Sequence, residues 1–199
     1  MPDALFFPRL IALLWLGWGL YWIVAAASSK RTVRRESAGA RVAYVIPLLI
    51  GGLLIAWRGV PWALLAARLW PRSLAAWWLG LILVAAGLGF AVWARMHLGR
   101  NWSGSVTVKE GHELIRSGPY AYVRHPIYTG LIAALLGTAI TVGTAGGVLG
   151  LAIIIASFVR KLRAEEVFMR ETFPVDYPRY RAEVPGLVPF TRPRRSAPR

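Results

Sequence analysis

Residues 127–159 read IYTGLIAALLGTAITVGTAGGVLGLAIIIASFV, an apolar run of 33 residues that contains no charged side chain. As one helix, this run would be about 50 Å long, well beyond the roughly 30 Å hydrocarbon core of a bilayer. The sequence GTAGG, at residues 143–147, interrupts the run near its middle. We therefore expect a helical hairpin that turns at GTAGG, with arms of about 16 residues, or about 24 Å each.

The whole chain has the composition of a membrane protein. Of its 199 residues, 56% are hydrophobic and only 17% are charged, and the mean hydropathy is +0.49. Such values are unusual for a soluble domain. The net charge of +15 would suggest nucleic-acid binding in a soluble chain. Here the basic residues lie between apolar runs, where they set topology and contact anionic lipid, so we expect no nucleic-acid partner.

Residue types exclude several kinds of active site. The chain has no cysteine, which removes disulfides, thiolate metal sites and cysteine nucleophiles together. Its three histidines, at positions 97, 112 and 125, match no usual metal-ligand spacing, so we expect no metal. Neither a phosphate-binding glycine loop nor a serine-hydrolase or zinc-protease motif occurs.

Three further apolar runs precede the hairpin, at residues 5–27, 42–57 and 74–94. The first is too long for the core of a signal peptide and is read as a retained span. A basic segment, residues 28–41, separates the first two runs. The positive-inside rule places this segment in the cytoplasm, with the N-terminus outside and the C-terminus inside. We therefore predict an all-α integral membrane protein with about five transmembrane helices, a C-terminal helical hairpin and a polar pocket on the cytoplasmic side.

Composition also divides the chain along its length. Residues 1–96 hold the N-terminal transmembrane helices, including an interfacial stretch at residues 58–73 that alternates Trp and Arg with apolar residues. Residues 97–190 hold the hairpin and the polar segments on either side of it. Residues 191–199 form a basic, Pro-containing tail that we expect to be disordered.

The two polar segments that flank the hairpin are GHELIRSGPYAYVRHPIY, residues 111–128, and RKLRAEEVFMRETFPVDYPRY, residues 160–180. A hairpin brings its two ends together, so His125–Tyr128 and Arg160–Glu166 should be neighbours. Juxtamembrane carboxylates gain nothing from anionic lipid, so Glu165 and Glu166 require a cationic partner or ligand. The alternative is an ion-pair ladder on the surface of the helix, involving Lys161.

The dipeptide His125-Pro126 predicts where the first arm of the hairpin begins. Pro126 restricts its predecessor to extended geometry and suits the first turn of a helix. Amide donors at such a helix start favour a negative group, for example a ligand carboxylate. Alternatively, His125 contacts lipid headgroups, and Tyr120, Tyr122 and Tyr128 are ordinary aromatic residues of the membrane interface.

Three separated motifs, LGRNWS, GHELIRSGPYAYVRHPIYTG and RAEEVFMRETFPVDYPRYRAEVPGLVP, occur in this order. Together they resemble the isoprenylcysteine carboxyl methyltransferase family, which is related to the membrane phospholipid methyltransferases. The resemblance covers roughly residues 98–190 and is absent from the first two spans. It implies an integral-membrane enzyme that uses S-adenosylmethionine without a Rossmann domain, with the cofactor in a cytoplasmic cavity formed by the C-terminal half.

The resemblance also implies which residues bind the cofactor. His112, Glu113, Leu114 and Ile115 match a strand-like wall of the cofactor site. Glu165 matches the carboxylate that follows the hairpin, a natural partner for the ammonium group of the ligand. The other implied cofactor contacts are Tyr120, His125, Pro126, Ile127 and Tyr128.

The implied acceptor site departs from the family pattern at one position. The substrate-facing Arg of the family falls on Lys161, with Arg160 next to it. Arg binds a carboxylate through two parallel hydrogen bonds, whereas Lys acts as a point charge, so the departure bears on substrate identity. Arg124 is a further catalytic candidate, because with Arg100 and Asn101 it could orient the acceptor.

The function implied by the resemblance is S-adenosylmethionine-dependent carboxyl O-methylation of a lipophilic, isoprenylcysteine-like acceptor. Methylation of a phospholipid amine or of a small thiol is an alternative within the same class. A non-catalytic membrane protein that retains the fold is the alternative from another class. The expected partners are thus a lipophilic or small-molecule acceptor and membrane lipid.

Overall fold

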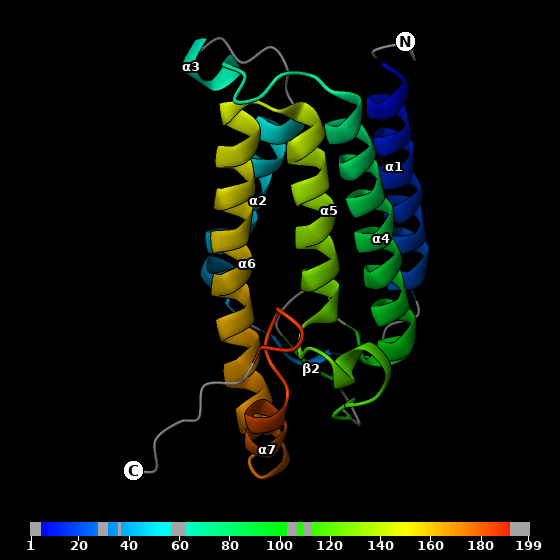
Figure 1. Cartoon of the computed structure of the whole chain (residues 1–199). Coiled ribbons are helices and arrows are strands. Elements are labelled where there is room, and N and C mark those ends of the chain that lie inside the picture. The colour runs from blue at the N-terminus through cyan, green and yellow to red at the C-terminus, as the bar shows by residue number, and fades with distance from the viewer. Residues whose placement is uncertain are drawn as a thin grey trace.

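The computed structural model describes residues 5–27, 32–35, 37–56, 63–102, 107–109 and 113–191. Its long helices run side by side along one axis, and successive helices are antiparallel (Figure 1). These helices are α1 (Phe6–Ala26), α2 (Ala38–Ala56), α4 (Leu74–Leu98), α5 (Pro126–Val142) and α6 (Ala145–Thr172). The shorter elements are helices α3 (Ala63–Ala66) and α7 (Asp176–Glu183), the 3-10 helices η1 (Gly99–Asn101) and η2 (Gly118–Ala121), and the strands β1 (Thr32–Arg35) and β2 (Thr107–Lys109).

Four of these helices, α1, α2, α4 and α6, are long and apolar enough to cross a membrane. They coincide with four of the five predicted spans, which confirms those four. Helix α5 is equally apolar but has only 17 residues. A full crossing by α5 therefore stays a prediction.

The predicted hairpin is present, and its turn lies at the first residues of GTAGG. Gly143 ends α5 with φ +69°, a left-handed conformation that suits glycine. Thr144 then caps α6, because its side-chain oxygen accepts a hydrogen bond from the amide of Gly147 at 3.1 Å. The chain after α3 braces this turn, since the amide of Leu69 donates to the Gly143 carbonyl at 3.0 Å. The described part of the expected interfacial stretch thus packs on the hairpin turn.

Glycines let the helix pairs α4–α5 and α2–α6 approach closely. A Cβ atom added to Gly87 would lie 2.5 Å from the carbonyl oxygen of Gly130, and one added to Gly150 would lie 2.5 Å from that of Gly51. Backbone therefore packs directly on backbone at both crossings, as small residues allow in membrane helices. These contacts fix α5 between α4 and α6.

We expect Gly130→Ala to lower the stability of the protein. The new Cβ would lie 2.8 Å from the backbone nitrogen of Ala91, and neither helix backbone can yield easily. Overpacking of this kind costs about 1–3 kcal/mol. Thermal unfolding in detergent, followed by tryptophan fluorescence, measures the effect. Gly89→Ala on α4 is the matched control, because nothing lies within 4 Å of its added Cβ; equal unfolding temperatures for the two variants would contradict this account.

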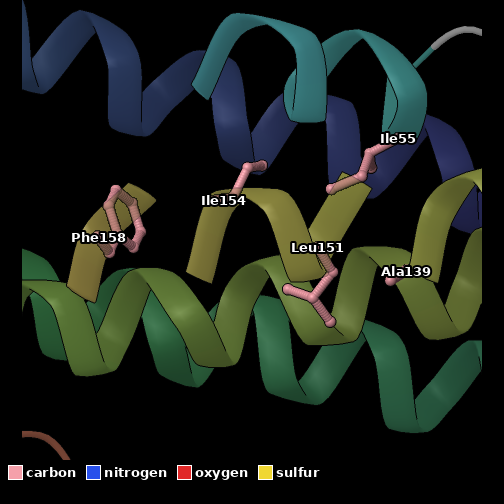
Figure 2. Packing of buried hydrophobic residues seen from close by; sticks show 5 residues of the cluster. All are labelled: Ile55, Ala139, Leu151, Ile154 and Phe158. Atoms are coloured by element: carbon pink, nitrogen blue, oxygen red, sulfur yellow. The ribbon is translucent and has the colours of Figure 1, made fainter. Parts of the chain in front are cut away.

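Two clusters of buried apolar residues hold the bundle together. One joins α2, α5 and α6 and consists of Ile55, Ala139, Leu151, Ile154 and Phe158 (Figure 2). The other joins α1, α4 and α5 and consists of Ile11, Val84, Leu88 and Ala134. Leu131 of α5 packs against both clusters. Helix α5 is therefore the central element, with α1 and α4 on one side and α2 and α6 on the other.

Besides its helices, the structure has a small sheet that was not predicted from the sequence. Strands β1 and β2 form a two-stranded antiparallel sheet, with Arg34 opposite Val108. It lies at the end of the bundle that carries α7 (Figure 1). Neither strand shows the apolar alternation from which strands are predicted, because their pairing depends on two loops that meet in space.

Candidate functional site

A cavity of about 440 Å³ lies at the α7 end of the bundle. Its wall combines residues from helices α1, α5, α6 and α7 with residues of the segments 98–102 and 113–128. The lining is mostly apolar and aromatic, with a few charged side chains. Such a mixture is typical of a site that binds a small organic molecule.

The cavity gathers nine of the ten predicted cofactor residues; the tenth, His112, lies outside the described residues. Glu113, Leu114 and Ile115 line the cavity, and their segment has no regular secondary structure. The other six are Tyr120, His125, Pro126, Ile127, Tyr128 and Glu165. The structure thus brings together both sides of the hairpin, as expected. The role of each residue stays a prediction.

Glu165 presents its carboxylate in this cavity and is held by neighbours from α5. The Tyr128 hydroxyl donates a hydrogen bond to Glu165 Oε1 at 2.6 Å. His125 Nδ1 lies 3.8 Å from Glu165 Oε2. The Glu165 side chain is only 24% exposed. Its carboxylate is therefore fixed in position and partly shielded from solvent, as a residue that binds a cationic ligand group should be.

Lys161 lines the same cavity one helical turn before Glu165. Its Nζ lies 4.0 Å from Glu165 Oε1, and its side chain is 12% exposed. The ammonium also lies over two aromatic rings, 5.1 Å from the ring centre of Tyr44 and 5.7 Å from that of Tyr128. The neighbouring candidate, Arg160, is exposed and is not part of the cavity wall.

Glu166 occupies a different environment from Glu165 and is not part of the cavity wall. Its Oε1 accepts hydrogen bonds from Arg124 Nη2 at 2.5 Å and Nε at 3.1 Å, and lies 3.3 Å from His125 Nε2. Its Oε2 lies 3.4 Å from Arg181 Nε. Both predicted carboxylates therefore have cationic neighbours, but only Glu165 faces the cavity.

Arg124 also lines the cavity, yet its guanidinium holds the C-terminal segment. Besides Glu166, it donates from Nη1 to the carbonyl of Val184 at 2.5 Å and to that of Arg181 at 3.3 Å. The backbone continues this contact, because the amide of His125 donates to the Gly186 carbonyl at 3.1 Å. This arrangement places Arg124 better for fixing α7 over the cavity than for orienting an acceptor.

We expect Arg124→Met to destabilise the protein strongly. The Arg124 and Glu166 side chains are 9% and 16% exposed, so the change would leave a poorly solvated carboxylate without its main partner. Loss of one member of such a pair costs about 3 kcal/mol, whereas apolar replacement of both is often nearly neutral. Unfolding temperatures of Arg124→Met and of Arg124→Met/Glu166→Met measure the difference. If the double variant is no more stable than Arg124→Met, then Arg124 does not stabilise the protein by compensating the Glu166 charge.

Three tyrosines of the site stay protonated over the physiological pH range. Burial raises the pKa of the Tyr120 phenol, and the nearby Glu165 carboxylate raises it further. Burial likewise raises the pKa of Tyr177 and of Tyr180. All three line the cavity, and the Tyr180 hydroxyl donates to the Tyr120 carbonyl at 2.6 Å. They supply neutral polar groups and not general bases.

Several cavity residues were not singled out from the sequence. Trp18 and Trp22 come from α1, and the rings of Trp22 and Trp102 meet edge to face at 5.6 Å. Their spacing in the sequence could have indicated them, because the tryptophans at positions 15, 18 and 22 lie on one face of a helix. Other residues in this group are Leu98, Leu131, Phe158, Phe168, Met169, Tyr177 and Tyr180.

Comparison with known proteins gives consistent similarities. Residues 78–171 match the sequence model of the isoprenylcysteine carboxyl methyltransferase (ICMT) family. A protein-S-isoprenylcysteine O-methyltransferase of Schizosaccharomyces pombe is 32% identical over 100 residues, which cover 49% of this chain and 42% of that protein. A protein of Oryza sativa subsp. indica, named "Probable protein-S-isoprenylcysteine O-methyltransferase", is 26% identical over 176 residues, or 85% of this chain and 88% of that protein.

A solved structure also shows similarity. It is the eukaryotic intramembrane Ras methyltransferase ICMT, which superposes with a TM-score of 0.49 at 25% identity, over 79% of this chain and 55% of that one. Curated relatives from Arabidopsis thaliana, like the one from Schizosaccharomyces pombe, are matched over less than two thirds of their length, by 61% and 65% for the two plant proteins.

Proposed function

We propose that this chain is a member of the isoprenylcysteine carboxyl methyltransferase family, whose sequence model matches its residues 78–171, and that it is an S-adenosylmethionine-dependent methyltransferase of the membrane. Its proposed reaction is O-methylation of the carboxyl group of a lipophilic, isoprenylcysteine-like acceptor. One observation supports this most directly. A single cavity at the end of an apolar bundle presents a fixed carboxylate, Glu165, one helical turn from a cation, Lys161.

The cavity residues fit S-adenosylmethionine by volume and by chemistry. About 440 Å³ lies within the usual range of small-molecule sites. Glu165 supplies a negative group for the ligand ammonium, and the aromatic wall suits a nucleobase. The side-chain oxygen of Asn101 on the cavity wall is buried without a hydrogen-bond partner among the described residues, so a polar ligand group could satisfy it.

When bound, this cofactor supplies a methyl group already activated on a positively charged sulfur. The protein therefore has to orient the two reactants and exclude water. Glu165 and His125 would hold the amino-acid end of the cofactor. Tyr120 and the apolar residues Leu114 and Ile115 would cover the remainder. Helix α7, held by Arg124 and by the Tyr180–Tyr120 hydrogen bond, would close the cavity from water.

Lys161 would bind the acceptor carboxylate as a point charge. A carboxylic acid with a pKa near 4 is already ionised at neutral pH, so the reaction requires no general base. This agrees with the raised pKa values of Tyr120, Tyr177 and Tyr180, which remain neutral. A thiol acceptor would instead need a group that removes its proton.

The apolar part of the cavity suits a lipophilic acceptor. Trp18, Leu131 and Phe158 line it, and all three belong to or pack against the buried clusters of the bundle. The cavity wall therefore extends from the polar end towards the apolar body of the helices. An acceptor with a long hydrocarbon chain could place that chain there while its carboxylate meets Lys161.

We further propose that the α7 end faces the cytoplasm. Strands β1 and β2 lie at this end, and β1 belongs to the basic segment between α1 and α2 (Figure 1). Basic loops favour the cytoplasmic side of a membrane. Soluble cofactor would then reach the cavity from the cytoplasm.

An acceptor screen tests the proposed function. The purified protein would be given S-adenosylmethionine together with N-acetyl-S-farnesylcysteine, phosphatidylethanolamine or a small thiol, and formation of S-adenosylhomocysteine would be followed. We expect the farnesylated carboxylate to give the fastest turnover. Faster turnover with the amine or the thiol would contradict carboxyl methylation. No turnover with any of them by a folded protein would favour a non-catalytic role.

A further inference from the structure

Lys161 and Glu165 are opposite charges four residues apart, so their side chains share one face of α6. The proposed function, on which this inference rests, assigns them to different ligands. Glu165 must meet the cofactor ammonium, and Lys161 must meet the acceptor carboxylate. A tight ion pair between them would weaken both sites. In the structure, Lys161 Nζ lies 4.0 Å from Glu165 Oε1, at the outer limit of a salt bridge.

Tyr44 provides a competing attraction for the Lys161 ammonium. Its ring centre lies 5.1 Å from Lys161 Nζ, within the range of about 6 Å for a cation–π interaction. The Lys161 side chain is 12% exposed, so water screens this attraction only weakly.

Tyr44 is a buried residue of α2, and its backbone is held against α6. Tyr44 is 5% exposed, and its carbonyl accepts a hydrogen bond from Ser157 Oγ of α6 at 2.7 Å. The Gly51–Gly150 contact packs the same two helices together. The α2–α6 packing therefore fixes the backbone of Tyr44 beside α6, which carries Lys161.

Glu165 has its own partner on the other side. The Tyr128 hydroxyl donates to its Oε1 at 2.6 Å, while the Tyr128 ring lies 5.7 Å from Lys161 Nζ. Each of the two charges is thus attracted by a group other than its opposite charge. Tyr128 contributes to both attractions but also lines the cavity, whereas Tyr44 does not line it.

We propose that Tyr44 is a positioning residue that holds the Lys161 ammonium away from Glu165, so that each charge stays available to its own ligand. Tyr44 lies outside residues 78–171, the region that matches the family model. It would act only through Lys161. Without the Tyr44 ring, Lys161 would pair with Glu165, and the cofactor ammonium would have to displace it.

A double-mutant cycle on cofactor affinity tests this role. Calorimetry would measure the dissociation constant of S-adenosylhomocysteine for the wild type, Tyr44→Phe, Tyr44→Leu, Lys161→Met and Tyr44→Leu/Lys161→Met. We expect Tyr44→Leu to weaken binding about tenfold, because the cation–π attraction is lost. Tyr44→Phe keeps the ring and should stay within about twofold of the wild type. In the Lys161→Met background, Tyr44→Leu should cause no further loss.

A purely structural role for Tyr44 would give a different pattern. The proposal is overturned if Tyr44→Phe binds S-adenosylhomocysteine as weakly as Tyr44→Leu, or if Tyr44→Leu binds it as tightly as the wild type. It is also overturned if Tyr44→Leu still weakens binding in the Lys161→Met background. Tyr122→Leu is the matched control, because Tyr122 is half exposed and does not line the cavity. Should Tyr44→Leu fail to fold, Tyr44→Met, with a more adaptable side chain, takes its place.

Failure of this inference can be told apart from failure of the proposed function. The proposed function is refuted, but the role of Tyr44 is not, if the wild type binds S-adenosylhomocysteine and methylates none of the acceptors while the double-mutant cycle gives the expected affinities. Only the role of Tyr44 is refuted if the wild type methylates the farnesylated carboxylate but the affinities in the double-mutant cycle differ from those expected. A folded wild type that binds no S-adenosylhomocysteine refutes both.

Discussion

Glu165→Gln should reduce the affinity for S-adenosylhomocysteine by on the order of 100-fold while leaving the fold intact. The variant has nearly the same shape, and the Tyr128 hydroxyl can still donate to the new amide oxygen in place of Glu165 Oε1. The change removes the negative charge and replaces one acceptor oxygen with an NH2 group. Removal of one partner from a poorly solvated, charged hydrogen bond costs 2 to 5 kcal/mol in typical complexes, or roughly 30-fold to several-thousand-fold in affinity.

Calorimetry on detergent-purified protein measures this loss, with unfolding temperature as the check on folding. The matched control is Glu171→Gln, which removes the same charge from an exposed position of α6 that is not part of the cavity wall. Retained affinity in Glu165→Gln, or an equal loss of affinity in Glu171→Gln, would show that Glu165 is not the carboxylate that binds the cofactor.

Lys161→Met should have the second large effect, and it should fall on the acceptor. Methionine preserves most of the apolar stem of the Lys161 side chain, so the fold should persist. The acceptor carboxylate would lose its proposed counter-charge in a partly buried site. We expect the value of kcat/KM for the farnesylated carboxylate to fall about 100-fold, with affinity for S-adenosylhomocysteine unchanged or slightly tighter.

Initial rates at varied acceptor concentration measure this change. Arg160→Met provides the comparison, because Arg160 is adjacent in sequence but exposed and outside the cavity wall. If Arg160→Met loses as much activity as Lys161→Met, then bulk positive charge and not the position of Lys161 governs turnover. A fall in cofactor affinity that matches the fall in kcat/KM would also contradict the assignment.

Much of the architecture could be predicted because local patterns decide it. The apolar run at residues 127–159 was too long for one crossing, so its glycines had to form a turn, and α5 and α6 do meet at Gly143. That turn brings His125 next to Glu165 and Glu166, although about forty residues separate them. The Pro at position 126 marked the first residue of α5.

Other features depended on packing that the sequence does not display. Glu165 and Glu166 are adjacent and chemically identical, yet only the helix rotation decides that the first faces the cavity and the second faces Arg124. The hydrogen bond from Arg124 to the Val184 carbonyl depends on where the C-terminal segment folds back. Trp18 could equally have faced lipid, since nothing local shows which face of α1 meets α5.

The measurement that tests the central claim most directly is the chemical form of the transferred methyl group. The wild type would be incubated with S-adenosylmethionine carrying a tritiated methyl group and with N-acetyl-S-farnesylcysteine, and the extracted product would be treated with mild alkali. A carboxyl methyl ester hydrolyses under these conditions, so the account predicts release of the label as volatile methanol. Label that stays with the product after alkali, or no labelled product from a folded protein, would contradict it.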